Sequence, residues 1–208
     1  MNRILIVAAV EAEADAVRQG LPADRPHGVT VLVGGVGSAQ AAAATSRALA
    51  LDPGYEAVLS MGIGGAFPGK AELGELLLAR RVVAADLGAD SPAGFLSVDE
   101  LGFGTSTLDA GRVPGIDAVV GIILTVNTAT GTDERAAELM ARHPQAVGEA
   151  MEGYGVAAAA ALADLPFAEV RAVSNVVGKR DRAAWQLGLA FKALTAAALP
   201  IAEGLEAC

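Results

Sequence analysis

Short apolar runs alternate with alanine-rich helical stretches along almost the whole chain, and this alternation constrains the fold more than any other feature. Strands are predicted at residues 3–9, 29–33, 56–61, 74–85 (one strand or a pair), 118–126 and 167–173, and helices at residues 11–19, 39–51, 133–142, 156–163 and 182–205. The pattern predicts an α/β fold with a largely parallel sheet between helix layers. The 208 residues suffice for one sizeable core, so a single domain spanning 1–208 is expected.

Glycines and polar residues follow the apolar runs, where the strands are predicted to end. They are Glu11 and Glu13, residues 35–38, residues 62–65, Asn127 and Thr128, and Ser174 and Asn175. Ligands of open α/β sheets bind beyond the carboxyl ends of the strands, so these residues predict one ligand site. Residues 86–115 are glycine-rich and aperiodic, and a loop this long is usually functional or mobile. The last helix is expected to fray beyond Pro200.

The composition of the chain restricts the classes of binding partner that it can have. The net charge of −9 argues against nucleic acid and against an anionic membrane surface, because both need a basic face. One cysteine, Cys208, leaves no disulfide framework, and His27 and His143 lie beside prolines in predicted loops, so no metal ligand set is visible. No secretory signal and no stretch approaching a membrane span is found. We expect a soluble cytoplasmic protein that needs no cofactor.

Two glycine patterns imitate nucleotide motifs. Residues 35–40 begin like a dinucleotide fingerprint, but Gln40 stands where the third glycine belongs. Residues 64–70 have P-loop spacing, yet Ala71 replaces the Mg²⁺-binding hydroxyl residue and no helix follows. Glycine also permits the backbone to pack closely against a small ligand, which is the preferred interpretation here.

Glu152 precedes an alanine-rich helix, and two interpretations are open. An acid at a helix start can simply complement the helix dipole. A carboxylate there can also accept hydrogen bonds from the two hydroxyls of a ribose.

Three further features point to chemistry. Glu11, Glu13 and Asp15 crowd one helix start, where mutual repulsion can raise the pKa of one acid towards that of a usable base. Arg171 lies in an apolar run and therefore needs a carboxylate partner. The amide of Asn175 offers a donor and an acceptor on one edge, which suits either base recognition or simple loop capping.

Together these residues resemble the nucleoside phosphorylase/nucleosidase family over nearly the whole length. The resemblance rests on residues 9–13 (AVEAE), 34–37 (GGVG), 61–65 (MGIGG), 151–153 (MEG) and 170–175 (VRAVSN). It implies a three-layer α/β/α sandwich around a mixed central sheet. It also implies a nucleoside substrate, water as the second reactant and a homo-oligomer, without a cofactor.

The resemblance further implies residue roles. In the related methylthioadenosine/S-adenosylhomocysteine nucleosidases the N-terminal acidic motif supplies the glutamate that activates water, which is similar in position to Glu13, with Glu11 as the alternative. Met151 and Glu152 match the ribose-binding pair, and Arg171 matches the arginine that orients the glutamate and water. Ser174 and Asn175 would contact the departing purine. Backbone contacts to the substrate are expected from Gly35, Gly37, Gly62, Ile63 and Gly64.

Two departures from the family pattern matter. The adenine-cleaving relatives carry aspartate where this chain has Asn175, and an amide favours a 6-oxopurine such as hypoxanthine over adenine. No aromatic residue stands near Asn127 to stack on the base, which leaves Phe95 or Phe103 as candidates. Basic residues after Asn175, namely Lys179, Arg180 and Arg182, form either a solvated surface or a site for an anionic group of the substrate. Trp185 is expected in the core.

Two other functions fit the same residues. A purine nucleoside phosphorylase would need arginines for phosphate, for which Arg80 and Arg81 are available. A non-catalytic nucleoside-binding protein would not need Glu13 and Glu152 in one pocket. The positions of Arg80 and Arg81 therefore bear on the phosphorylase alternative. The positions of Glu13 and Glu152 bear on the non-catalytic alternative.

Overall fold

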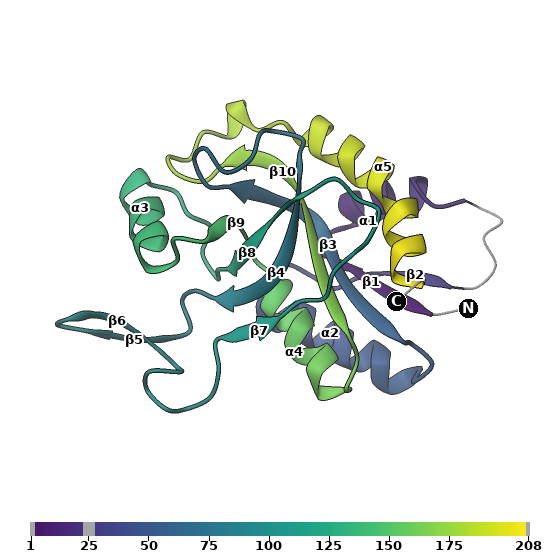
Figure 1. Ribbon diagram of the computed structural model, residues 1–208, viewed down its shortest axis with the longest axis horizontal. Helices are drawn as coiled ribbons and strands as arrows, with labels where there is room; N and C mark the ends of the chain where they lie inside the picture. Colours follow the sequence, from purple (N-terminus) through teal and green to yellow (C-terminus); the bar gives the residue numbers. More distant parts are fainter. Residues whose placement is uncertain (1–2, 23–27, 207–208) are drawn as a thin grey trace.

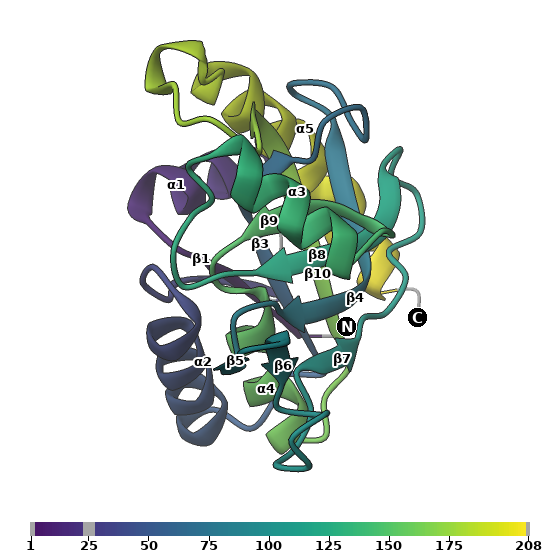
Figure 2. The same cartoon turned by 90° about the vertical axis from the view of Figure 1, so that its left-hand side faces the viewer.

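A mixed sheet lies between two helix layers in the computed structural model, which describes residues 3–22 and 28–206. The strand order is β10-β4-β8-β9-β3-β1-β2, and β7 pairs with residues 81–83 of β4. Helices α1 and α5 cover one face of the sheet, and α2 and α4 cover the other (Figures 1 and 2). The predicted α/β/α architecture is confirmed.

The strands of the main sheet are β1 (Ile4–Ala8), β2 (Val29–Val33), β3 (Ala57–Ala66), β4 (Leu76–Ala84), β7 (Thr107–Asp109), β8 (Val119–Thr125), β9 (Ala146–Ala150) and β10 (Phe167–Val176). The helices are α1 (Glu11–Gln19), α2 (Ser38–Leu51), α3 (Asp133–Arg142), α4 (Gly153–Leu162) and α5 (Leu187–Glu206), with a short 3₁₀ turn η1 (Arg182–Ala184) before α5. Most pairs along the sheet are parallel, whereas β10–β4, β3–β9 and β4–β7 are antiparallel. Because β10 also pairs with β3, the sheet path closes on itself.

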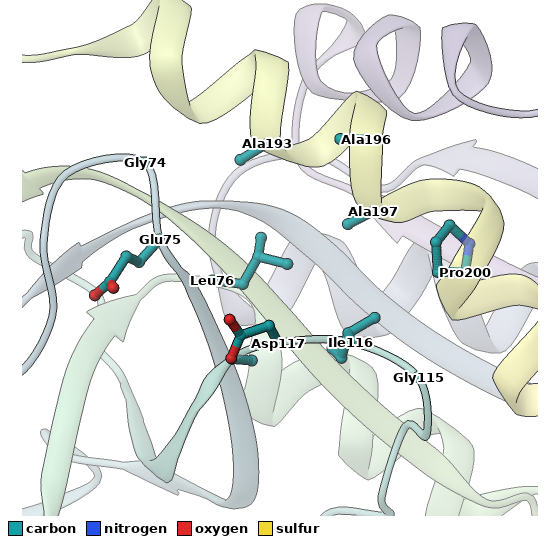
Figure 3. A pocket seen from close by; sticks show the side chains of 11 residues that line it. Gly74, Glu75, Leu76, Gly115, Ile116, Asp117, Ala193, Ala196, Ala197 and Pro200 are labelled. Atoms are coloured by element: carbon teal, nitrogen blue, oxygen red, sulfur yellow. The ribbon is translucent and has the colours of Figure 1, made fainter.

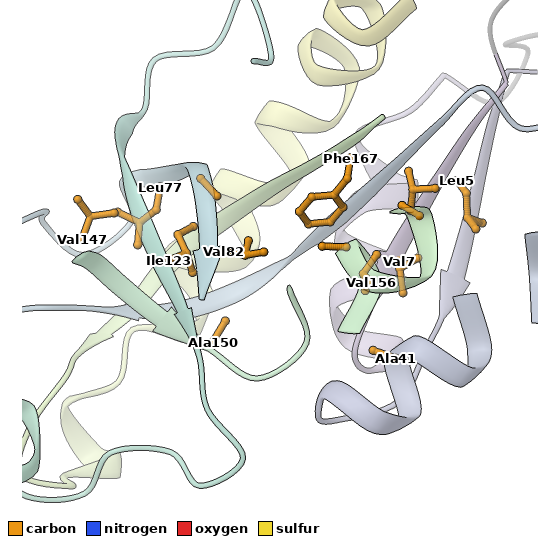
Figure 4. Packing of buried hydrophobic residues seen from close by; sticks show 14 of the residues in the cluster. Leu5, Val7, Ala41, Leu77, Val82, Ile123, Val147, Ala150, Val156 and Phe167 are labelled. Atoms are coloured by element: carbon orange, nitrogen blue, oxygen red, sulfur yellow. The ribbon is translucent and has the colours of Figure 1, made fainter. Parts of the chain in front are cut away.

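The core consists of small and aliphatic side chains on both faces of the sheet. Leu5 and Val7 of β1 pack towards α2 and α4, in the cluster drawn in Figure 4. Ile4 and Ile6 of the same strand pack on the other side, in the cluster that includes Leu194 of α5. Side chains alternate between faces along a strand, so the unbroken apolar run of β1 reflects burial on both sides.

Several element predictions were wrong in their limits. The glycine segment after residue 61 is not a loop, because β3 continues to Ala66 and pairs with β10 and β9. Strand β9 was not predicted, since its five residues include a glycine and a glutamate. Residues 86–115 contain the hairpin β5 (Gly88–Ser91) and β6 (Gly94–Ser97) as well as β7, so they do not form one long loop. The hairpin projects away from the main body of the molecule (Figure 1).

Helix α5 departs from two expectations. It starts at Leu187 rather than residue 182, and it continues through Pro200 to Glu206. The window Leu187–Gly204 is also long and apolar enough to cross a membrane by length and composition, contrary to the expectation that no stretch approaches a span. Core helices pass the same test, and Ala190, Leu194 and Ile201 on the buried face of α5 are fully inaccessible to solvent.

Candidate functional site

A cavity of about 300 Å³ lies where β1, β3, β8, β9 and β10 end, at the edge of the sheet that the sequence singled out. Its lining comprises Ala9, Val10, Glu13, Val36, Ile63, Gly64, Gly65, Val126, Ala129, Thr130, Glu149, Ala150, Met151, Glu152, Ser174, Asn175, Arg180 and Trp185. Seven of the predicted site residues are therefore brought together: Glu13, Ile63, Gly64, Met151, Glu152, Ser174 and Asn175.

Glu13 is the buried acid of helix α1, with only 3% of its surface exposed. Its Oε2 accepts hydrogen bonds from the backbone N–H of Ala9 (2.9 Å) and Val10 (3.2 Å), and its Oε1 accepts one from Ile63 (2.8 Å). Three backbone donors, two from the connection between β1 and α1 and one from β3, thus hold the carboxylate at the cavity wall. Hydrogen bonds from backbone N–H groups to a carboxylate are among the stronger ones in proteins.

Glu11 is not an equivalent candidate. Its side chain is two-thirds exposed and pairs with Arg18 at 2.6 Å, as does Asp15 at 3.0 Å. The three acids of α1 therefore do not share one site, because only Glu13 lines the cavity. The geometry selects Glu13 over Glu11 as the acid that faces the cavity.

Glu152 occupies the N-cap position of α4, but its side chain makes no capping hydrogen bond. Instead, Oε1 accepts from the Gly37 N–H at 3.1 Å and Oε2 from the Met151 N–H at 3.3 Å. Oε2 also lies 3.2 Å from Nη1 of Arg171. The side chain therefore does not cap the helix but is directed into the site, where it lines the cavity.

Arg171 lies beneath the cavity and forms ion pairs with Glu152 and Glu169. Nε donates to Oε1 of Glu169 at 2.8 Å, and Nη2 donates to Oγ of Ser60 at 2.7 Å. Arg171 and Glu169 are both essentially inaccessible to solvent, so the predicted carboxylate partner is confirmed. Burial raises the pKa of Glu169 despite the neighbouring guanidinium. Burial opposes the charge on Arg171, but Glu169, Glu152 and Glu13 outweigh it and raise the pKa of the guanidinium.

The glycines have distinct roles. A Cβ on Gly62 would lie 2.6 Å from Oε1 of Glu13 and 2.8 Å from Nη1 of Arg171, so any larger residue there would clash with both side chains. Gly37 donates to Glu152, at a positive φ of 91° that favours glycine. Gly64 lines the cavity directly. Gly35 does not line the cavity, and its surroundings are the side chain of Gln40.

Strands β9 and β10 contribute Glu149, Ser174 and Asn175 to the cavity lining. Oγ of Ser174 lies 2.8 Å from Oδ1 of Asn175 and 3.2 Å from the Gly64 carbonyl, and its single hydrogen can be donated to either oxygen. Glu149 accepts from the backbone N–H and the hydroxyl of Thr130 at 2.8 and 2.6 Å. Burial raises the pKa of Glu149, although the hydrogen bonds from Thr130 act in the other direction.

Several predicted contacts do not reach the cavity. Phe95 packs under the guanidinium of Arg142, and Phe103 is 82% exposed, so neither lines the site. Asn127 is bound to Asp86 through its backbone N–H (2.7 Å) and its amide (2.9 Å).

Of the basic residues that were considered as anion-binding candidates, only Arg180 lines the cavity. Arg81 pairs with Asp109 at 2.9 Å and Arg80 donates to Gln145, both outside the cavity. Arg180 does line the cavity, whereas Lys179 and Arg182 do not. Trp185, expected in the core, lies at the cavity with Arg180 stacked 5.7 Å from its ring centre. His143 is half-buried at the end of α3, and burial lowers the pKa of its imidazole. His27 and Cys208 lie outside the described residues.

Some other cavities among the described residues are larger but have different chemistry, as two of them show. One, of about 370 Å³, lies between α5 and the start of β4, where alanines of α5 face Leu76 and Ile116 (Figure 3). The other, of about 410 Å³, lies beside the β5–β6 hairpin and includes Arg142 and His143. Neither holds Glu13, Glu152 or Asn175, although the second is lined by Arg81 and Phe95.

Glu149, Glu169, Ser60 and Thr130 were missed as site residues from the sequence. Glu169 had a usable signal, because it stands two residues before Arg171 in one strand and so shares its face. Ser60 pairs with Glu169 across β3 and β10, a register that the sequence does not specify. Glu149 lies in the strand that was not predicted.

A sequence model described as the phosphorylase superfamily matches residues 3–200. The chain belongs to the phosphorylase superfamily. It is 46% identical to the futalosine hydrolase of Streptomyces coelicolor, over 98% of this chain and 96% of that protein. It is also 46% identical to the futalosine hydrolase of Acidothermus cellulolyticus, over 91% of this chain and 86% of that one.

Solved structures give the same fold for this member of the phosphorylase superfamily. The native structure of Helicobacter pylori futalosine hydrolase superposes with a TM-score of 0.80 and 17% identity, and the match covers 100% of this chain and 98% of the other. At that identity the likeness concerns the fold alone.

Proposed function

We propose that the protein hydrolyses the N-glycosidic bond of futalosine, releasing hypoxanthine and dehypoxanthine futalosine in menaquinone biosynthesis. The observation that carries the proposal is that Glu13 and Glu152 face one cavity that Asn175 also lines. The 46% identity to two futalosine hydrolases supports the substrate. A non-catalytic binding protein would have no need for an acid held as Glu13 is.

The proposed reaction begins with rupture of the bond between C1′ of the ribose and the purine nitrogen. The bonding electrons leave with the purine, and positive charge develops on the sugar. Glu152 accepts hydrogen bonds from the 2′- and 3′-hydroxyls and places its negative charge near the developing cation. Glu13 accepts a proton from water, whose oxygen forms the new bond to C1′.

Asn175 and Ser174 contact the departing purine in this scheme. An amide cannot supply a proton, but it can donate a hydrogen bond to an oxygen or nitrogen of the base. The departing base therefore takes its proton from solvent. Arg171 does not line the cavity and acts as a positioning residue, because its guanidinium fixes Glu152 from below.

The remainder of the substrate extends towards the cavity mouth. Futalosine carries a carboxyphenyl ketone on the 5′ side of the sugar, and among the described residues Arg180 is the one cation that lines the cavity. We assign the distal carboxylate to Arg180 and the phenyl ring to the neighbourhood of Trp185. A phosphorylase would need a cationic cluster for phosphate, and Arg80 and Arg81 are engaged elsewhere.

Futalosine and inosine compared in phosphate-free buffer test the proposal. Both carry hypoxanthine, but only futalosine has the distal carboxylate. We expect hypoxanthine release from futalosine without phosphate, with a higher kcat/KM than for inosine. Release that requires added phosphate would instead identify a phosphorylase, and the absence of release from either compound would refute the proposed activity.

We also propose that residues 1–208 act as one nucleosidase domain in the cytoplasm and that the protein is a homo-oligomer. The family match to residues 3–200 supports the first point. Large apolar side chains on the surface, Phe103 and Leu162 at 82% exposure each, support the last. The mass measured by analytical ultracentrifugation would determine the oligomeric state.

A further inference from the structure

Glu149 is a buried acid at the cavity that the proposed reaction does not use. It is 7% exposed, it lies on β9, and among the described residues it forms no ion pair. Arg135 favours its charged form only at longer range. An unpaired carboxylate is costly to bury unless its oxygens receive hydrogen bonds.

Thr130 supplies two of those hydrogen bonds and fixes the orientation of the side chain. Its backbone N–H binds Oε1 and its hydroxyl binds Oε2, at 2.8 and 2.6 Å. Both favour the ionised form against the effect of burial. A carboxylate has about four acceptor positions, so Glu149 retains capacity for a donor that enters the cavity.

The sheet register places Glu149 opposite Asn175. Gly65 of β3 pairs with Glu149 of β9 on one side and with Asn175 of β10 on the other. Directly paired residues point to the same face of a sheet, so the three positions form one row. Neighbouring strands lie about 4.8 Å apart, which separates the two outer backbones by about 10 Å. The row has an amide and a carboxylate at its ends, Nδ2 of Asn175 extends over Gly65 to 3.0 Å from the position of a Cβ there, and all three residues line the cavity.

We propose that Glu149 reads the N1–H edge of a 6-oxopurine whose other edge meets Asn175. This inference rests on the proposed function, because it takes the ligand to be a purine nucleoside. A 6-oxopurine presents an N1–H donor, which the Glu149 carboxylate accepts. Adenine presents an N1 lone pair at the same place, which the carboxylate repels. Glu149 is thus a specificity-determining residue, and Thr130 is its positioning residue.

Binding of the free bases tests the inference without requiring turnover. Dissociation constants for hypoxanthine and adenine are measured by calorimetry for the wild-type protein and for Glu149→Gln. A hydrogen bond to a charged group corresponds to a change of about 10- to 100-fold, so Glu149→Gln should weaken hypoxanthine binding by that factor. Adenine binding should stay unchanged or become tighter, which removes the preference for hypoxanthine.

Glu100→Gln is the matched control. Glu100 also accepts from a backbone N–H and a hydroxyl, those of Ser97 at 2.7 and 2.9 Å, but it lies outside the cavity. The Glu100→Gln variant should leave the dissociation constants of hypoxanthine and adenine unchanged. If Glu149→Gln does not fold, Thr130→Val provides the second variant, with a smaller change in the same direction.

The outcomes separate the two proposals. A wild-type preference for hypoxanthine that survives in both Glu149→Gln and Thr130→Val would overturn the role of Glu149, as would a wild-type preference for adenine. If the wild-type protein hydrolyses no nucleoside but shows a Glu149-dependent preference for hypoxanthine, the proposed function fails while this inference stands.

Discussion

Replacing Glu13 by glutamine should lower kcat for futalosine hydrolysis by about 10²- to 10⁴-fold, the usual contribution of a general base. The amide has the size of the carboxylate but cannot take a proton from water. Affinity for hypoxanthine should change little, because the proposed base contacts come from Asn175 and Glu149 on other strands. Steady-state kinetics of base release and calorimetric titration with hypoxanthine measure the two effects separately.

Glu11→Gln is the matched control for this experiment. Glu11 belongs to the same helix turn, but it is exposed and pairs with Arg18. The control should hydrolyse futalosine at the wild-type rate. Wild-type kcat in Glu13→Gln would show that Glu13 is not the base, and loss of activity only in Glu11→Gln would show that the wrong acid had been assigned.

Arg171→Met should lower the free energy of unfolding by about 3–5 kcal/mol, the range observed when one partner of a buried ion pair is removed. The substitution leaves Glu169, with no exposed surface, and Glu152, with 5%, without their cation. Burial already raises the pKa of Glu169. Without the guanidinium the destabilisation should be largest at high pH and shrink as the pH falls, since protonation removes the buried charge. Urea denaturation at two pH values measures it.

The exposed ion pair of Arg81 and Asp109 serves as the control for the buried ion pairs of Arg171. Its side chains are 48% and 79% exposed, so Arg81→Met should change the free energy of unfolding by only about 0–1 kcal/mol. The double variant Arg171→Met with Glu169→Gln should recover part of the loss, because one buried charge is then absent. Equal stability of Arg171→Met and the wild-type protein would contradict the assignment of a buried charge network.

The sequence predicted well those features that depend on local pattern. The helices Glu11–Gln19 and Asp133–Arg142 and the strand Val29–Val33 have the predicted limits. The need of Arg171 for a carboxylate followed from its apolar surroundings alone. The convergence of Glu13 and Asn175 followed from the rule that ligands bind at strand ends.

Features that depend on register between distant strands could not be predicted. Glu149 and Asn175 are related only through Gly65, and no local pattern encodes that pairing. The choice between Glu11 and Glu13 required the fold, because only Glu13 reaches the Ile63 N–H of β3. Residues 86–115 seemed structureless in sequence because strands β5, β6 and β7 have three or four residues each, too few for a clear period.

Incorporation of ¹⁸O from labelled water tests the central claim, that the cavity delivers water to C1′ of a hypoxanthine nucleoside. Futalosine is converted in ¹⁸O-water with phosphate present, and the sugar product is analysed by mass spectrometry before its label can exchange. The account predicts one ¹⁸O atom in the sugar product, none in the hypoxanthine and no sugar phosphate. A sugar 1-phosphate without label would contradict it.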